Sequence, residues 1–167
     1  LIIQKYGGTS VADAVRVKEV AKRVLKYKNE GHDVIVVVSA PAGTTDSLIR
    51  RAYELSETPN KRELDMLLTS GEQISIASLA IAIEDLGKKA VSLNAFQVDF
   101  KTTDEHTKAT ILDINTDIIR EKLSEGNVVV FAGFQGITEN NEITTLGRGG
   151  SDTTAVALGA ALNADEV

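Results

Sequence analysis

Short apolar runs alternate with longer amphipathic stretches along the chain. Four runs rich in valine and isoleucine have the length of strands, and their continuous hydrophobicity predicts strands buried on both faces. They cover residues 1–6, 33–40, 89–94 and 127–134. Helical patterns lie at residues 10–30, 45–56, 61–86, 115–125 and 151–163. This alternation predicts a mostly parallel sheet with helices on both faces, an α/β fold of the three-layer αβα sandwich type.

One segment interrupts the alternation. Residues 96–114 contain polar turn residues and a second apolar run, which predict a hairpin or the edge of a lobe. The chain has no internal repeat, no low-complexity tract and only two prolines, Pro41 and Pro59. We therefore expect residues 1–167 to form part of one domain.

Composition narrows the classes of partner. With 167 residues, of which 43% are hydrophobic, the chain can bury a sizeable core. Its net charge of -6 argues against nucleic acid and anionic membranes, because both favour an excess of Lys and Arg. The absence of cysteine excludes disulfides and thiolate chemistry and fits a reducing, cytoplasmic location. Apolar runs such as Val34–Val38 are far shorter than the roughly 20 residues of a membrane span, so we expect small-molecule partners and no membrane.

Glycines cluster just after the predicted strands. The carboxyl edge of a parallel sheet is its usual binding edge, and glycine-rich turns before helices expose N–H groups that bind phosphate. The clustered positions are Gly7, Gly8, Gly43, Gly133, Gly136, Gly147, Gly149 and Gly150. Glycine is also common in any turn between a strand and a helix, and neither the Walker pattern nor GxGxxG is present.

Lys5 ends the first predicted strand, two residues before the first glycine pair. An ammonium there can neutralise charge on a transferring phosphoryl group. Its position is equally typical of a solvated lysine at the end of a strand.

Glu72 interrupts an apolar stripe. It shares one helix face with Leu64, Leu68 and Ile76, because positions four residues apart lie one above the other. A buried carboxylate without a cation is costly, so we expect a cationic partner from the protein or from a ligand. Gly71 beside it predicts a close approach of another segment to the helix backbone.

The segment TTLGRGGSDTTA at residues 144–155 combines glycines with two opposite charges. Arg148 can hold a carboxylate or phosphate with two hydrogen bonds, while Asp152 can position a lysine. Arg148 and Asp152 can also simply pair with each other, and Ser151 can cap the following helix.

Five motifs, in order along the whole chain, together resemble the aspartokinases. They are KYGGTS (5–10), VVVSA (36–40), LLTSGEQIS (67–75), AGFQG (132–136) and TTLGRGGSDTTA (144–155). The resemblance implies the amino-acid kinase fold and the MgATP-dependent phosphorylation of the side-chain carboxylate of L-aspartate to 4-phosphoaspartate. That reaction opens the pathway to lysine, threonine and methionine.

The resemblance also implies roles for individual residues. The phosphate end of the site would contain Lys5, Gly7, Gly8, Thr9, Gly149 and Gly150, with Asp152 ordering the catalytic lysine. The aspartate pocket would contain Ser39, Thr45, Glu72, Arg148 and Ser151, with Glu72 facing the substrate ammonium. Mg²⁺ would be held mainly through the phosphates of ATP, with no metal ligand from the protein.

The implied chemistry needs no general base. A carboxylate nucleophile with a usual pKa of about 3.9 is already ionised at pH 7. We therefore assign neither His32 nor His106 a catalytic role. Lys5, Mg²⁺ and backbone N–H groups would offset the repulsion between two anions.

Some features depart from the family. Pro41 and Ala42 stand in a loop that is often Met-Gly, and the segment around His106 lacks the usual basic and glycine residues. The chain stops at NADEV, before the segments that in this family hold the nucleotide base, a second phosphate-contacting lysine and the regulatory ACT domains. The resemblance thus implies an N-terminal piece of a longer, homo-oligomeric cytoplasmic enzyme, a piece expected to be inactive by itself.

Two alternatives remain open at this point. A related kinase that acts on glutamate or acetylglutamate would share the sheet and the glycine loops. A non-catalytic amino-acid-binding or assembly module is the alternative from a different class. Comparing the phosphorylation of aspartate with that of glutamate distinguishes an aspartate kinase from a related kinase. Measuring aspartate binding beside ATP turnover distinguishes either kinase from a non-catalytic module.

Overall fold

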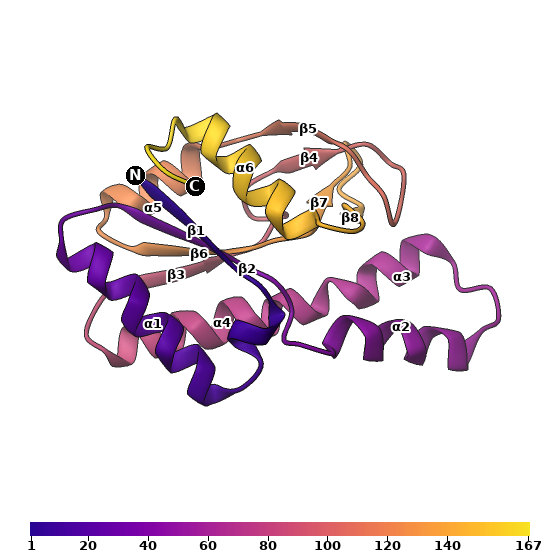
Figure 1. Ribbon diagram of the computed structural model, residues 1–167. Coiled ribbons are helices and arrows are strands. Elements are labelled where there is room, and N and C mark those ends of the chain that lie inside the picture. Colours follow the sequence, from indigo (N-terminus) through magenta and orange to yellow (C-terminus); the bar gives the residue numbers. More distant parts are fainter.

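A four-stranded parallel sheet forms the centre of the structure, a computed structural model that describes residues 1–167 (Figure 1). Its strands lie in the order β1-β2-β6-β3, so the chain passes from the edge strand β1 to β2, crosses to the opposite edge at β3 and returns to β6 between β2 and β3. They are β1 (Ile2–Tyr6), β2 (Val34–Val38), β6 (Val128–Ala132) and β3 (Ala90–Leu93). All four correspond to the apolar runs that the sequence predicts as strands.

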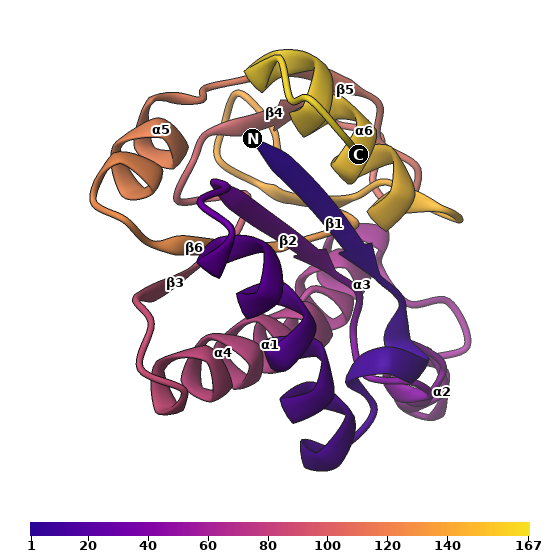
Figure 2. The ribbon, with the colours of Figure 1, turned by 60° about the vertical axis from the view of Figure 1, so that its left-hand side comes forward.

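Helices cover both faces of this sheet, as predicted for a three-layer sandwich (Figure 2). Helices α1 (Ala14–Asn29) and α4 (Ser70–Asp85) pack on one face, against alternate residues of β2 such as Val36. Helices α5 (Asp117–Ser124) and α6 (Gly150–Leu162) pack on the other face. A 3-10 helix η1 (Gly8–Val11) joins β1 to α1. Successive side chains of a strand point to opposite faces, which divides the core into two apolar clusters.

The expectation that all four strands are buried on both faces is correct only for the two central ones. Every residue of β2 and β6 is buried, whereas Lys5 of β1 is exposed and Val91 of β3 is half-buried. β1 and β3 lie at the two edges of the sheet, where each has only one neighbouring strand within it. An edge position leaves part of the strand open to solvent, whatever its hydrophobicity.

A second, smaller sheet extends from the first, with the strand order β5-β4-β7-β8. Strands β4 (Phe100–Thr102) and β5 (Ile111–Ile114) pair antiparallel, which confirms the predicted hairpin within residues 96–114. Strands β7 (Gln135–Ile137) and β8 (Ile143–Thr145) were not predicted. Each has three residues and is rich in Gln, Gly or Thr, so neither forms an apolar run long enough to be recognised.

The helical segment predicted at residues 61–86 is divided into α3 (Lys61–Leu68) and α4 by Thr69, whose hydroxyl donates to the Asp65 carbonyl at 3.0 Å. Helices α2 (Thr44–Leu55) and α3 project together from the body of the molecule (Figure 1). Taken together, Lys61–Asp85 is long and apolar enough to cross a membrane by length and composition, and half of its most apolar window is buried. The apolar residues of this segment pack against α1 and the sheet, as those of a core helix do.

The two faces of α4 should respond differently to truncation. Leu79 is fully buried, whereas Ile81 on the same helix is 67% exposed. We expect Leu79→Ala to lower the free energy of unfolding by about 2–5 kcal/mol, because it leaves a cavity in the core. Ile81→Ala should change it by less than about 0.5 kcal/mol. Urea denaturation of both variants checks this, and equal losses would contradict the packing of α4.

Candidate active site

The residues with candidate chemistry meet in one polar cavity of about 320 Å³ at the carboxyl edge of β1 and β2. Its walls come from the end of β1, the loops after β2, β6 and β8, and the first turns of α2, α4 and α6. The lining residues are Lys5, Ser39, Ala40, Thr45, Glu72, Phe134, Gly147, Arg148, Gly149, Gly150, Ser151 and Asp152. The structure thus brings together nine of the twelve residues that the resemblance assigns to the site.

Glu72 is the most buried charged group of this cavity, with 2% of its surface exposed. Its Oε1 accepts from the Ala40 N–H at 3.3 Å, and its Oε2 accepts from the Gln135 side-chain amide at 3.4 Å. Both partners are neutral. Burial therefore raises the pKa of Glu72 from 4.5 to about 7, against the lowering effect of these hydrogen bonds. The cation that we expected for this carboxylate does not come from another side chain of the chain.

Gly71 allows α4 to approach the loop after β2. A Cβ atom at this position would lie 2.8 Å from the Ala40 Cβ and 3.3 Å from the Thr44 Cγ2. The predicted close approach is therefore present. It holds Glu72 within reach of the Ala40 N–H.

Lys5 and Asp152 form an ion pair of 3.0 Å between Nζ and Oδ1. Their side chains are 29% and 70% exposed, and such exposed pairs contribute about 0–1 kcal/mol to stability. The pair therefore orients the lysine more than it stabilises the fold. The alternative in which Asp152 pairs with Arg148 is not what the structure contains.

The N-terminus of α6 faces the cavity without a side-chain cap. The helix begins at Gly150, and its N-cap is Gly149 rather than Ser151. The proposed capping role of Ser151 is thus wrong, because Ser151 already lies in the first turn. Its Oγ instead bonds the Ser39 Oγ at 2.9 Å, which ties α6 to the loop after β2. Uncapped N–H groups at a helix start attract anions.

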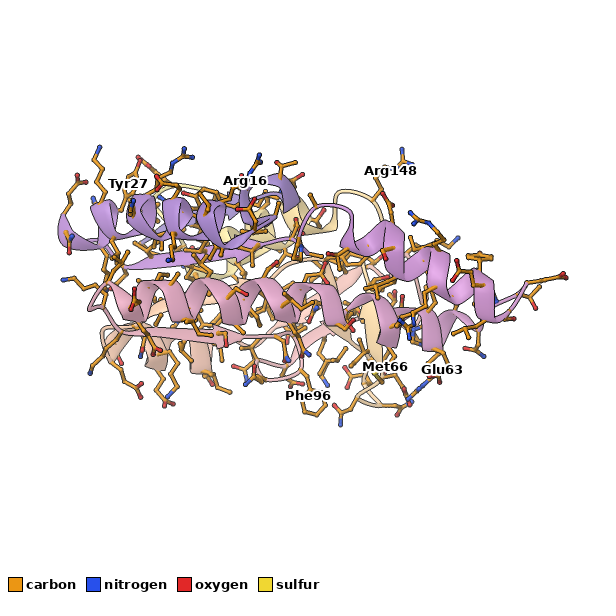
Figure 3. All side chains as sticks on the ribbon, turned by 90° about the horizontal axis from the view of Figure 1, so that it is seen from below. Arg16, Tyr27, Glu63, Met66, Phe96 and Arg148 are labelled. Carbon is orange, nitrogen blue, oxygen red and sulfur yellow. The ribbon has the colours of Figure 1, made fainter.

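Arg148 is exposed and takes part in none of the ion pairs of the chain, whereas Arg62 pairs with Glu63 and Glu142. Figure 3 shows its side chain standing out from the surface of the molecule. Gly147 and Gly149 on either side have φ angles of 81° and 74°. The guanidinium is consequently free to bind an anion.

Three residues assigned to the phosphate end do not line the cavity. Gly7 lies beside the Lys5 ammonium, and Gly8 packs under the Ala40 carbonyl. Thr9 is exposed in a separate surface pocket, where its carbonyl accepts from Arg16 Nη1 at 2.9 Å. Its side chain therefore lies outside the cavity.

Three residues of the site were not singled out from the sequence, and one of them is Ala40, which lines the cavity and whose N–H donates to Glu72. Phe134 lines the cavity with a φ of 74°, and Gln135 donates to Glu72 and to the Thr69 carbonyl. Both belong to the motif AGFQG, which directly follows a buried strand. The sequence feature that could have identified Gln135 is a glutamine between two glycines at the binding edge of the sheet.

The fold and the site define a class of protein. A three-layer α/β domain presents two cationic side chains, a helix N-terminus and a buried carboxylate without a cation at one edge of its sheet. Such a site suits a small ligand that has both anionic groups and an ammonium group.

Comparison with known proteins agrees with that class. A profile of the amino acid kinase family matches residues 1–167. The aspartokinase of Geobacillus stearothermophilus is 54% identical over 166 residues, which cover 99% of this chain and 41% of that protein. Aspartokinase 2 of Bacillus subtilis is 50% identical over 166 residues, with the same two coverages. The chain belongs to the amino acid kinase family.

Solved structures show the same likeness. The aspartate kinase from Synechocystis superimposes with a TM-score of 0.85 and 49% identity, over 99% of this chain and 27% of that one. Escherichia coli aspartokinase III in complex with aspartate and ADP gives a TM-score of 0.85 with 27% identity, over 98% and 47% of the two chains. The chain spans about 40% of the length of the curated relatives that it matches.

The raised pKa of Glu72 makes stability depend on pH. The carboxyl binds its proton more tightly in the folded chain than in the unfolded one, so the folded state holds more protons between pH 4.5 and about 7. The contribution of Glu72 to the free energy of unfolding is fully present below pH 4.5 and is lost as the pH rises through about 7. The total loss is about 3 kcal/mol. Glu72→Gln should therefore gain stability relative to the wild type from pH 5 to pH 8.

Urea denaturation at the two pH values measures this difference. Glu84→Gln, on the exposed side of the same helix, is the matched control and should follow the wild type. A Glu72→Gln variant whose stability changes with pH in parallel with the wild type would contradict the raised pKa.

Proposed function

We propose that the chain forms the acceptor-substrate part of an aspartate kinase, which transfers the γ-phosphoryl group of ATP to the side-chain carboxylate of L-aspartate. The single observation that carries the proposal is the buried Glu72, which lines the cavity and lacks a cation. The ammonium group of an amino acid is the partner that this carboxylate requires. The proposal is supported by relatives named aspartokinase and by the similar structure that contains aspartate and ADP.

The proposal divides substrate binding between two charged groups. The ammonium of aspartate pairs with Glu72 in a region from which water is excluded, where charge pairing is strong. One of the two carboxylates of aspartate pairs with Arg148, whose planar guanidinium can form two parallel hydrogen bonds. Ser39, Thr45 and Ser151 also line the cavity and provide hydroxyl groups.

Transfer then requires only alignment and charge neutralisation. An oxygen of the ionised side-chain carboxylate attacks the γ-phosphorus, the bond from this phosphorus to the bridging oxygen of ATP breaks, and ADP leaves with that oxygen. We propose that Lys5, which is paired with Asp152, neutralises charge on the transferring group. The N–H groups at the start of α6 supply further partial positive charge.

The donor is proposed to be ATP with Mg²⁺. No group of three or more His, Asp or Glu side chains gathers to hold a metal ion. We propose that the nucleotide carries the Mg²⁺, because Mg²⁺ commonly keeps its waters and binds substrate phosphates with few protein ligands. When bound, Mg²⁺ neutralises phosphate charge.

Further parts of the proposal rest on the resemblance alone. We propose that the reaction is the first step toward lysine, threonine and methionine, and that the intact enzyme is a cytoplasmic homo-oligomer. The most direct test of the substrate is a coupled assay of ADP release by the intact enzyme with aspartate, glutamate or acetylglutamate. Turnover with glutamate rather than aspartate would contradict the proposed substrate.

Replacing Glu72 should weaken the binding of aspartate but not the binding of ATP. In the intact enzyme, Glu72→Gln should weaken aspartate binding by about 2–4 kcal/mol, because it removes the charge that pairs with the ammonium. The KM for ATP should change little. Steady-state kinetics and calorimetry with aspartate measure both effects, with Glu84→Gln as the control. An unchanged KM for aspartate would remove Glu72 from the pocket.

Arg148 and Lys5 should differ in the kinetic constant that they affect. Arg148→Lys should raise the KM for aspartate, since a single ammonium cannot reproduce a grip by two hydrogen bonds. Lys5→Ala should instead lower kcat with little effect on that KM, because its charge matters most during transfer. If both variants only raised KM, the division into pocket and phosphate residues would be wrong.

A further inference from the structure

A fully buried carboxylate lies outside the cavity, on α3. Asp65 is 0% exposed, and its two oxygens accept four hydrogen bonds. The donors are the Thr145 N–H (3.1 Å), the Thr145 hydroxyl (2.7 Å), the Thr107 N–H (3.0 Å) and His106 Nδ1 (2.8 Å). Along the chain, Thr145 is 80 residues from Asp65 and Thr107 is 42 residues from it. A buried carboxylate with this many donors is fixed in one orientation.

These bonds clamp the base of the loop that carries Arg148. Thr145 is the last residue of β8 and lies three residues before Arg148, and its carbonyl accepts from the Ala109 N–H at 2.9 Å. On the other side, a Cβ atom at Gly147 would lie 3.2 Å from the Thr107 carbonyl oxygen. The loop thus rests on Thr107, and both Thr107 and Thr145 are bonded to Asp65.

Backbone strain marks the same place. Thr107 has a φ of 73°, a left-handed conformation that a β-branched residue rarely adopts. Strained residues persist only where the surrounding structure holds them, and they concentrate at functional sites. The hydrogen bond from the Thr107 N–H to Asp65 is one such restraint.

We propose that Asp65 and His106 are positioning residues that hold the Arg148 loop in its substrate-binding geometry. The proposal rests on the proposed function, in which Arg148 grips a carboxylate of aspartate. Arg148 has no ion-pair partner of its own, and glycines flank it on both sides. The base of the loop is therefore what determines where the guanidinium lies. His106 contacts Asp65 and does not line the cavity, so it acts through the loop and not on the substrate.

The two histidines of the chain provide a matched pair of variants. In the intact enzyme, His106→Ala should raise the KM for aspartate by on the order of tenfold, because small displacements of a binding group are costly. The KM for ATP should stay within about twofold. His106→Asn should restore the KM for aspartate, since its amide offers an N–H near the position of Nδ1. His32→Ala, at an exposed site far along the chain, should behave as the wild type.

A double-mutant cycle with Arg148→Ala distinguishes positioning from a merely structural role. If His106 acts through Arg148, His106→Ala should add little to the KM for aspartate once Arg148 is absent. Fully additive effects, or equal losses for aspartate and ATP, would overturn the proposal. If His106→Ala does not fold, Thr145→Val against Thr145→Ser provides the same comparison, because only the serine keeps the hydroxyl that donates to Asp65.

Hydrogen exchange separates this inference from the proposed function. Without any ligand, the hydrogen-bonded amides of Thr107, Ala109 and Leu146 should exchange about tenfold faster in His106→Ala than in the wild type, and at the wild-type rate in His106→Asn. Unchanged exchange in His106→Ala would overturn the positioning role even if aspartate is the substrate. Failure of the wild-type enzyme to phosphorylate aspartate would instead overturn the proposed function and leave the exchange result standing.

Discussion

The burial of the Glu72 carboxylate without a cation is the constraint on which the site depends. Two neutral donors, the Ala40 N–H and the Gln135 amide, are too weak to offset the loss of water, so the pKa of Glu72 rises to about 7. The free protein is thereby less stable near neutral pH than it would be with a neutral side chain there. An ammonium ligand removes that penalty, so part of the affinity for the ligand comes from destabilisation already present in the free site. Gly71, which lets α4 approach the loop after β2, makes this burial possible.

The remaining charges are arranged around that carboxylate by the topology. The parallel sheet brings the ends of β1 and β2 to one edge, and the short second sheet returns the chain to the same edge before α6 begins. Lys5 and Asp152 pair on one side of the cavity, whereas Arg148 is left without a partner in the loop between β8 and α6. The main sheet therefore positions Lys5, and Asp65 on α3, bonded to the end of β8 in the second sheet, holds the base of the loop that carries Arg148.

Much of this could be predicted from the sequence because it depends on local pattern. Strand-like runs and helical periodicity located the main sheet and its helices, and the interrupted apolar stripe revealed Glu72. Features set by distant segments could not be found in this way. The strands β7 and β8 are stabilised by pairing with each other and, for β7, with β4, and not by their own three-residue sequences. The bond of Ser151 to Ser39 likewise joins residues more than a hundred positions apart, and so does the pairing of Asp152 with Lys5, which the resemblance implied but the local pattern could not distinguish from pairing with Arg148.

The measurement that tests the central role of Glu72 most directly is the number of protons released when L-aspartate binds, obtained by calorimetry in buffers of different ionisation enthalpy. Because the pKa of Glu72 is about 7 in the free protein and an ammonium ligand favours its charged form, aspartate should release about one proton per molecule bound at pH 6 and none at pH 8. Succinate, which has both carboxylates and no ammonium, should release none, and Glu72→Gln should abolish the release by aspartate. Aspartate binding at pH 6 without proton release, or with the same release in Glu72→Gln, would contradict the account.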